Sequence, residues 1–198
     1  MQHMIHNFLF PLLVFFQFHI SDINSVQPVG LIETPLGNIY ILFHEQTPNH
    51  RKSFIQLAEA GYWDSLTFNR VIPNFVAQGG CPDTEEGFND PEYLLSPELD
   101  SDLTHIYGAV GAGRDENPGK VSATCQFYIV QNPKGLHRLD GDYTIFGQVI
   151  RGMDVIDQIV GIPTSAENTP IRPISMIVKI LQMEEKEIDK LKAVDKII

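Results

Sequence analysis

Cysteine is scarce in this sequence of 198 residues, which contains only Cys81 and Cys125. Two cysteines are too few for a disulfide framework, so a hydrophobic core must hold the fold together. We expect two free thiols. A single bridge between them is the alternative in an oxidising compartment, and it depends on a geometry that the sequence does not give.

Positive charge is also in short supply, because 14 lysines and arginines face 25 aspartates and glutamates. The resulting net charge of −11 argues against nucleic acid as a partner, since its phosphates require a basic surface. Hydrophobic residues make up 43% of the chain and charged residues 20%, which is ordinary for a globular protein. The length fits one domain with a sizeable core.

Several catalytic and ligand-binding motifs are absent. The seven histidines form no His-Glu-x-x-His pattern and no tight spacing with cysteine, so no metal site is predicted. Gly111-Ala112-Gly113 lacks the rest of a dinucleotide or phosphate-binding loop, and no Gly-x-Ser-x-Gly turn marks a serine nucleophile. These absences argue against metal-dependent, nucleotide-dependent and covalent catalysis.

No lysine or arginine precedes Arg51, although an apolar run occupies residues 8–18. The run is too short for a comfortable membrane span and contains Pro11, whereas its length fits the apolar region of a secretory signal. The missing basic residues and the lack of a clear cleavage site count against a signal. We expect residues 1–28 to be a signal peptide and polar connector, and the protein to be exported to the periplasm or secreted. The alternatives are an uncleaved N-terminal anchor and a mis-assigned start or disordered appendage, with a membrane-anchored or cytoplasmic protein as the corresponding location.

The chain that follows has the pattern of a mainly-β domain. Strands are predicted where apolar residues alternate or cluster between turn signals. A helix is predicted to start at Thr47-Pro48, where a hydroxyl and a proline favour a helix start, and a second one covers Met153–Val160. The main predicted strands cover residues 31–34, 38–43, 107–112, 126–131, 144–150 and 173–183. We expect residues 29–183 to form one domain.

Residues 184–198 form a charged, helix-prone tail. Ile188, Leu191, Val194 and Ile198 recur at spacings of three, three and four, which places them on one face of a helix. This face could dock on the domain or on a partner. We expect instead a fraying, solvated helix at the chain terminus.

The segment from Phe68 to Gly80 is the most informative stretch of the chain. It reads Phe-Asn-Arg-Val-Ile-Pro-Asn-Phe-Val-Ala-Gln-Gly-Gly. Side chains two apart on a strand share a face, so Val76 and Gln78 point the same way, and Arg70 can reach that face from the preceding strand. A guanidinium beside apolar groups and an amide fits a neutral, kinked peptide better than an anion.

Three blocks of sequence, in order, resemble the cyclophilin-type peptidyl-prolyl cis-trans isomerases. They are Phe68-Asn69-Arg70 through Gln78-Gly79-Gly80, then Gln126-Phe127-Tyr128-Ile129, and finally Leu139-Asp140-Gly141 followed by Phe146-Gly147-Gln148-Val149. The resemblance implies a closed eight-stranded antiparallel β-barrel capped by two α-helices. It also implies an enzyme without a cofactor that accelerates X-Pro isomerisation in protein folding, with proline-containing polypeptides as partners. We expect a monomer with no membrane span.

The resemblance also assigns site residues. Arg70 is the expected catalytic group, because a guanidinium stays charged and can stabilise a twisted amide. The expected substrate-binding residues match family positions in the proline pocket, at the peptide backbone and in the neighbouring groove: Phe75, Val76, Gln78, Gly113, Gln126, Tyr128, Leu139 and Tyr143.

Three positions depart from the animal members of the family and resemble its bacterial type. Tyr128 stands where a pocket phenylalanine is usual, Arg138 where a tryptophan is common, and Tyr143 where a histidine contacts substrate. The missing tryptophan argues against binding of cyclosporin-like macrocycles. A peptide-binding module without turnover and an assembly scaffold are the alternative functions, and the intact Arg70 favours the enzyme.

Overall fold

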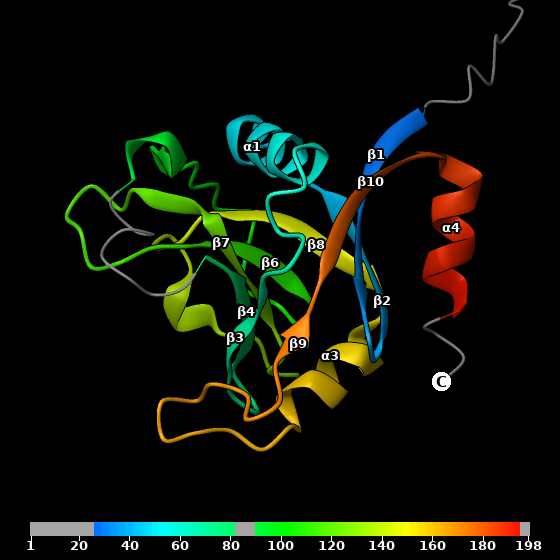
Figure 1. Cartoon of the computed structure of the whole chain (residues 1–198). Helices are drawn as coiled ribbons and strands as arrows, with labels where there is room; N and C mark the ends of the chain where they lie inside the picture. The colour runs from blue at the N-terminus through cyan, green and yellow to red at the C-terminus, as the bar shows by residue number, and fades with distance from the viewer. Residues whose placement is uncertain (1–25, 82–89, 195–198) are drawn as a thin grey trace, which may run out of the picture.

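One antiparallel β-sheet dominates the structure, a computed structural model that describes residues 26–81 and 90–194 (Figure 1). The predicted signal peptide lies outside the described residues, and residues 26–28 of the predicted connector already belong to the first strand. The strands in the described ranges are β1 (Val26–Thr34), β2 (Gly37–Phe43), β3 (Thr67–Val71), β4 (Val76–Gly80), β5 (Leu94–Leu95), β6 (Ala109–Gly113), β7 (Ser122–Val130), β8 (Ile145–Arg151), β9 (Ile174–Ser175) and β10 (Ile177–Glu184). The α-helices are α1 (Pro48–Glu59), α3 (Met153–Val160) and α4 (Glu185–Val194), and short 3-10 turns cover Pro91–Tyr93 and His137–Leu139.

The sheet curls into a near-closed barrel. Its strands follow the order β10-β1-β2-β8-β6-β7-β4-β3-β9, and β5 pairs with β7 outside this path. The last two strands belong to one segment interrupted at Met176, and they pair with β3 and β1. This segment therefore joins both edges of the sheet and leaves eight strand positions around the barrel. The predicted mainly-β barrel is confirmed, although the single strand expected over 173–183 is broken in two.

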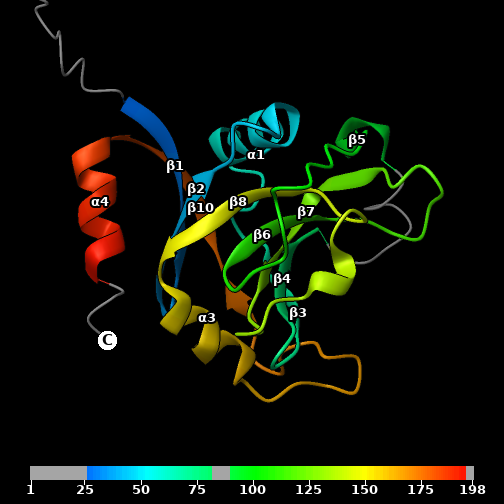
Figure 2. The same cartoon turned by 180° about the vertical axis from the view of Figure 1, so that it is seen from behind.

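Both predicted helices are present, and they lie at opposite ends of the barrel. Helix α1 begins at Pro48, directly after Thr47, and α3 covers the expected residues. Figures 1 and 2 show α1 at one end and α3 at the other from both sides of the molecule. Within the described ranges, no helix is long and apolar enough to cross a membrane.

Aromatic side chains from α1 and the strands pack together inside the barrel. The ring centroid of Phe54 lies 4.6 Å from that of Trp63 and 5.9 Å from that of Phe127. The Trp63 ring N–H donates a hydrogen bond to the Cys125 carbonyl at 2.9 Å. Neighbouring side chains on a strand alternate between its two faces. Because Phe127 points into the barrel, Gln126 and Tyr128 on either side of it point to the outer face. The candidate site lies on that outer face.

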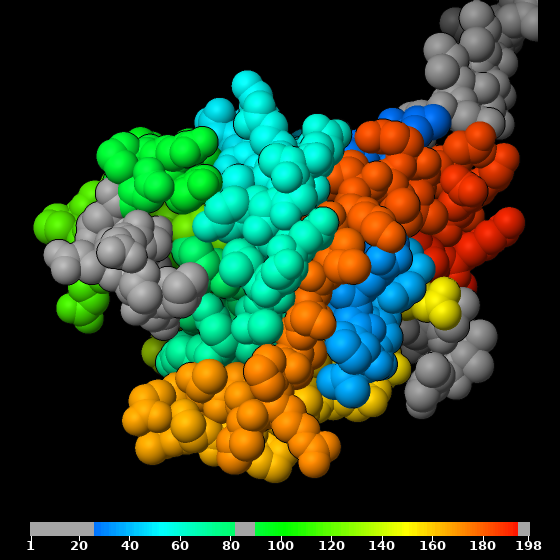
Figure 3. Space-filling model, viewed as in Figure 1, coloured from blue at the N-terminus to red at the C-terminus, as the bar shows by residue number. Residues whose placement is uncertain are grey.

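The described part of the C-terminal tail, helix α4, docks on the barrel, so the expectation of a fraying, solvated helix was wrong there. In α4, Ile188 is only 1% exposed and packs against Val29 and Ile150, with Leu191 at the edge of the cluster. Figure 3 shows α4, in red, beside β10, in orange. The charged tail has one apolar face, and the residues that cover it, Val29 of β1 and Ile150 of β8, lie far away in the sequence.

We expect Ile188→Ala to lower the free energy of unfolding by about 2–4 kcal/mol, because the truncation removes buried contacts and leaves a cavity. Ile171 is 66% exposed, so Ile171→Ala is the matched control and should change this free energy by less than about 0.5 kcal/mol. Urea unfolding followed by circular dichroism measures both. Equally small effects would mean that α4 is not docked in solution.

Candidate active site

A row of polar side chains crosses three neighbouring strands on the outer face of the barrel. Arg70 of β3 lies opposite Gln78 of β4, and Gln78 lies opposite Tyr128 of β7. The Arg70 guanidinium donates a hydrogen bond to the side-chain oxygen of Gln78 at 3.3 Å. Strand pairing thus brings two distant sequence blocks to one place.

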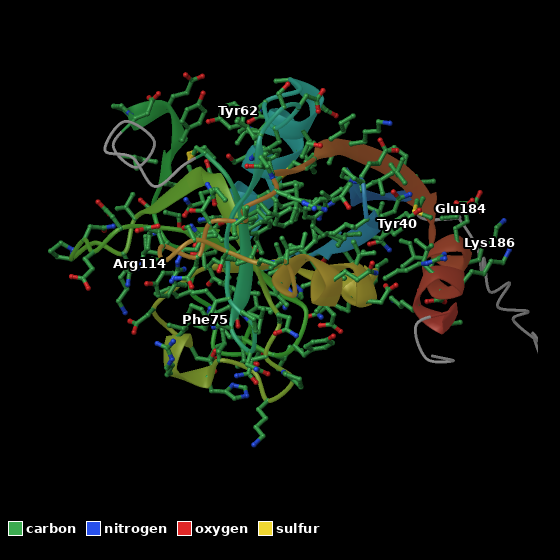
Figure 4. The ribbon with its side chains drawn as sticks, turned by 60° about the horizontal axis from the view of Figure 1, so that its bottom comes forward. Tyr40, Tyr62, Phe75, Arg114, Glu184 and Lys186 are labelled. Atoms are coloured by element: carbon green, nitrogen blue, oxygen red, sulfur yellow. A yellow bond between two sulfur atoms is a disulfide. The ribbon has the colours of Figure 1, made fainter. Side chains whose placement is uncertain are left out.

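These three side chains line a cavity of about 240 Å³. Its wall contains each of the nine residues that the sequence assigned to catalysis or substrate binding, together with two further arginines. The lining residues are Arg70, Phe75, Val76, Gln78, Gly113, Arg114, Gln126, Tyr128, Arg138, Leu139 and Tyr143. Figure 4 shows Phe75 and Arg114 on the same side of the molecule, away from Glu184 and Lys186 near the tail.

One wall of the cavity is apolar. Val76 and Tyr128 are 3% and 6% exposed and belong to a small hydrophobic cluster of their own. Partly buried side chains complete this cluster on the cavity side, namely Phe75, Leu139 and Tyr143. The cavity therefore offers an apolar surface next to polar groups from the strand row.

Two glycines leave space for the side chains of the site. A Cβ atom on Gly111 would lie 2.3 Å from the ring of Tyr128, and one on Gly113 would lie 2.3 Å from the side-chain oxygen of Gln126. Both distances are far shorter than a van der Waals contact. Any larger residue at these positions would displace Tyr128 or Gln126.

The charge of Arg70 lies beside the apolar wall. Its guanidinium carbon is 5.8 Å from the centroid of the Phe75 ring, within the range of a cation–π contact. None of the ion pairs within the described ranges involves Arg70. The guanidinium is therefore not neutralised by a carboxylate there, and its hydrogen bond is to the neutral amide of Gln78.

The hydroxyl group of Tyr128 has a buried partner. It lies 2.8 Å from Nε2 of His105, and Nδ1 of the same histidine lies 2.7 Å from Oδ1 of Asp140. Burial lowers the pKa of His105 and outweighs the hydrogen bond to Asp140, which raises it, so the ring is neutral. Because Nδ1–H then donates to the carboxylate, Nε2 accepts from the tyrosine hydroxyl. Burial likewise raises the pKa of Tyr128 well above its usual value, so its hydroxyl keeps the proton.

Cys81 and Cys125 form a disulfide, so the expectation of free thiols was wrong. The bridge joins the residue after β4 to β7, and their Cα atoms are 5.4 Å apart. The carbonyl of Cys81 accepts hydrogen bonds from Gln126 at 3.1 Å and Asn69 at 3.0 Å. Pairing of β4 with β7 brings the cysteines together, and this long-range contact is not visible in the sequence. The disulfide covalently links the end of β4 to β7 next to Gln126, a residue of the cavity wall.

A metal centre has no basis in the described part of the chain, where no three His, Cys, Asp or Glu side chains are grouped to hold an ion. The cavity wall thus offers three guanidiniums, two side-chain amides, two tyrosine side chains and an apolar surface. Such groups can bind and polarise a peptide.

Comparison with known proteins identifies the family. A family model described as cyclophilin type peptidyl-prolyl cis-trans isomerase/CLD matches residues 30–182. The chain belongs to this family. Its enzyme class is therefore that of a peptidyl-prolyl cis-trans isomerase, as the three sequence blocks predicted.

Individual relatives agree with this assignment. A peptidyl-prolyl cis-trans isomerase of Acinetobacter baylyi is 35% identical over 169 residues, which span 81% of this chain and 87% of the relative. One from Schizosaccharomyces pombe is 38% identical over 152 residues, spanning 74% and 94%. A cyclophilin of Cryptosporidium parvum, crystallised in the presence of the dipeptide Ala-Pro, superposes with a TM-score of 0.69 at 25% identity. That alignment covers 79% of this chain and 99% of the other.

Sequence reasoning missed Arg114 as a residue of the cavity and noted Arg138 only as a departure from the family. Both line the cavity wall. The position of Arg114, directly after the predicted groove residue Gly113, was the available signal. Its side-chain direction depends on the loop that follows β6, which the sequence pattern does not specify.

We expect Tyr128→Phe to lower the free energy of unfolding by about 1–3 kcal/mol, because it leaves Nε2 of the fully buried His105 without a partner. Tyr143→Phe is the matched control, since no hydrogen bond from the Tyr143 hydroxyl is seen within the described residues, and it should cost less than about 0.5 kcal/mol. Urea denaturation at pH 7.5 measures both variants. Equal losses would show that the His105 contact does not stabilise the site.

Proposed function

We propose that the enzyme isomerises X-Pro bonds by stabilising the twisted amide with Arg70. Rotation about a peptide bond meets a barrier of about 18–20 kcal/mol, because resonance gives the C–N bond partial double-bond character. When the bond twists, the proline nitrogen becomes pyramidal and regains a lone pair. A fixed cationic donor aimed at that nitrogen binds the twisted state more tightly than the planar states, which lowers the barrier without a covalent bond.

The apolar wall of the cavity is proposed to hold the proline ring. Phe75, Val76, Tyr128 and Leu139 present the hydrophobic surface that such a ring requires, with Tyr143 beside them. Gln78 and Gln126 are proposed to bind the peptide backbone on either side, and Gly113 to leave room for it. Clamping the ring and the backbone separately lets the bond between them rotate.

The observation that carries this proposal is the position of Arg70, uncompensated by any carboxylate in the described chain and next to the Phe75 ring. An arginine with a purely structural role would be expected to pair with one of the 25 acidic residues. A peptide-binding module without turnover would need the apolar wall but not a free cation. An assembly scaffold would need neither group.

We expect Arg70→Ala to lower kcat/KM by roughly 10²–10³-fold, the usual loss when a donor that stabilises transition-state charge is removed. Peptide binding should persist, because the apolar wall is unchanged. Arg172→Ala is the matched control, since Arg172 is exposed and lies outside the cavity. A protease-coupled assay on a short X-Pro peptide measures the rate, and titration calorimetry measures the binding. A wild type that binds peptide without accelerating isomerisation would establish the binding-module alternative.

We further propose that the isomerase domain, predicted over residues 29–183 and extended by β1 back to Val26, belongs to an exported protein whose preceding N-terminal segment directs export. The apolar run at residues 8–18 and the Cys81–Cys125 disulfide support this, because disulfides persist in oxidising compartments. Help with folding of exported proteins is the corresponding role.

In the cells that produce the protein, we expect the mature form to be outside the cytoplasm and to have lost Met1. Its two cysteines should resist alkylation until a reductant is added, because both are in the disulfide. N-terminal sequencing and mass spectrometry after alkylation test these statements. A cytoplasmic protein that keeps Met1 and alkylates at both cysteines without reductant would rule out export.

A further inference from the structure

Arginine is concentrated at the cavity. The chain has six arginines, and Arg70, Arg114 and Arg138 all line this one cavity. The whole chain carries a net charge of −11, so the clustering is opposite in sign to the rest of the protein. Catalysis as proposed uses only Arg70, which leaves two guanidinium groups at the cavity without a role.

Arg138 stands next to the surface proposed for the proline ring. Its guanidinium carbon lies 5.1 Å from the centroid of the Phe75 ring, and that of Arg70 lies 5.8 Å from the same centroid. Arg138 is exposed, in the 3-10 turn that contributes Leu139 to the cavity. A peptide bound against Phe75 therefore passes close to this second guanidinium.

Arg114 is held in place against the ring of Tyr143, another aromatic residue of the cavity wall. Its guanidinium carbon lies 4.3 Å from the centroid of the Tyr143 ring. Its Nε donates to the backbone carbonyl of Asp142 at 3.1 Å and one Nη donates to that of Asp115 at 2.9 Å. Both acceptors are neutral, so these bonds orient the guanidinium without neutralising it.

Carboxylates near the two arginines are bonded to other partners, although Arg114 also contributes to lowering the pKa of the Asp142 carboxyl. Asp140 accepts from His105 and His137, Asp142 pairs with Lys120 at 2.7 Å, and Asp115 accepts from Asn117 at 3.0 Å. In the described ranges no ion pair includes Arg114 or Arg138. Arg114 and Arg138 thus present two positive groups at the cavity wall that remain available to a ligand.

We propose that Arg114 and Arg138 determine specificity, and that the enzyme prefers peptides with aspartate or glutamate within two residues before the proline. This rests on the proposed isomerase function of the same cavity. A guanidinium binds a carboxylate through charge-assisted and often paired hydrogen bonds. An acidic side chain next to a proline held against Phe75 would meet one of these groups.

The overall charge of the protein makes the opposite prediction. A net charge of −11 repels acidic peptides at long range, so steering by the whole molecule would favour lysine near the proline. Charges more than about 8 Å apart are largely screened at physiological ionic strength. The local arginines therefore dominate there, and the order of peptide preference separates the two effects.

The test compares acetylated, amidated tetrapeptides Ala-Xaa-Pro-Phe and Xaa-Ala-Pro-Phe in which Xaa is Glu, Gln or Lys. Exchange NMR measures kcat/KM for isomerisation without a coupling protease. We expect glutamate to be preferred over lysine by about three- to tenfold in at least one series, since each exposed charge contact changes an affinity by about 1.4- to 5-fold. The preference should shrink in 1 M salt.

Arg138→Gln and Arg114→Gln should each reduce the ratio of the glutamate to the lysine value, and the double variant should bring it to about one or below. Lys134→Gln is the matched control, because Lys134 is exposed in the same segment, carries the same charge and lies outside the cavity. Melting temperatures of the variants verify that they are folded. A wild-type ratio of one or less, or an equal reduction in Lys134→Gln, would overturn the proposal. In those cases turnover of all peptides leaves the isomerase function intact, whereas turnover of none would reject that function itself.

Discussion

Register between β3, β4 and β7 is the constraint on which the site depends. It places Arg70 opposite Gln78 and Gln78 opposite Tyr128, so that the cation, the amide and the aromatic wall meet on the outer face of the barrel. The same register turns Phe127 into the core, where it packs with Phe54 and Trp63. A slip of one residue would exchange the two faces. Burial of the aromatic core therefore also fixes the geometry of the site.

Beneath the apolar wall, a chain of hydrogen bonds gives the hydroxyl of Tyr128 a buried partner. The hydroxyl donates to His105, which donates to Asp140, and Asp140 also accepts from His137 at the surface. Burial lowers the pKa of His105, and its neutral ring is what allows it to accept and donate at once. The departure from phenylalanine is thus accommodated by a specific partner. The tyrosine ring remains available to the cavity.

Local sequence patterns predicted the main strands and the two end helices, and the resemblance to the family supplied the nine site residues, which line one cavity. The local patterns failed where distant segments had to be paired. The burial of Ile188 depends on Val29 and Ile150, and the disulfide depends on the approach of β4 to β7. Neither contact has a local signature, because spacing within one segment says nothing about which surface faces it. The direction of Arg114 was unpredictable for the same reason, since a loop outside any periodic element sets it.

Closure of the barrel by its final segment also determines when the protein can fold. β1 pairs with β10, so that Val26 has Glu184 as its partner. In the same way β3 pairs with β9, which comes about 100 residues later in the sequence. Contacts between such distant residues form slowly, because the long intervening chain must first be brought together. During synthesis β1 therefore lacks its neighbour on that side until residues 177–184 have left the ribosome. Until then the barrel of a nascent chain stays open between β1 and β3.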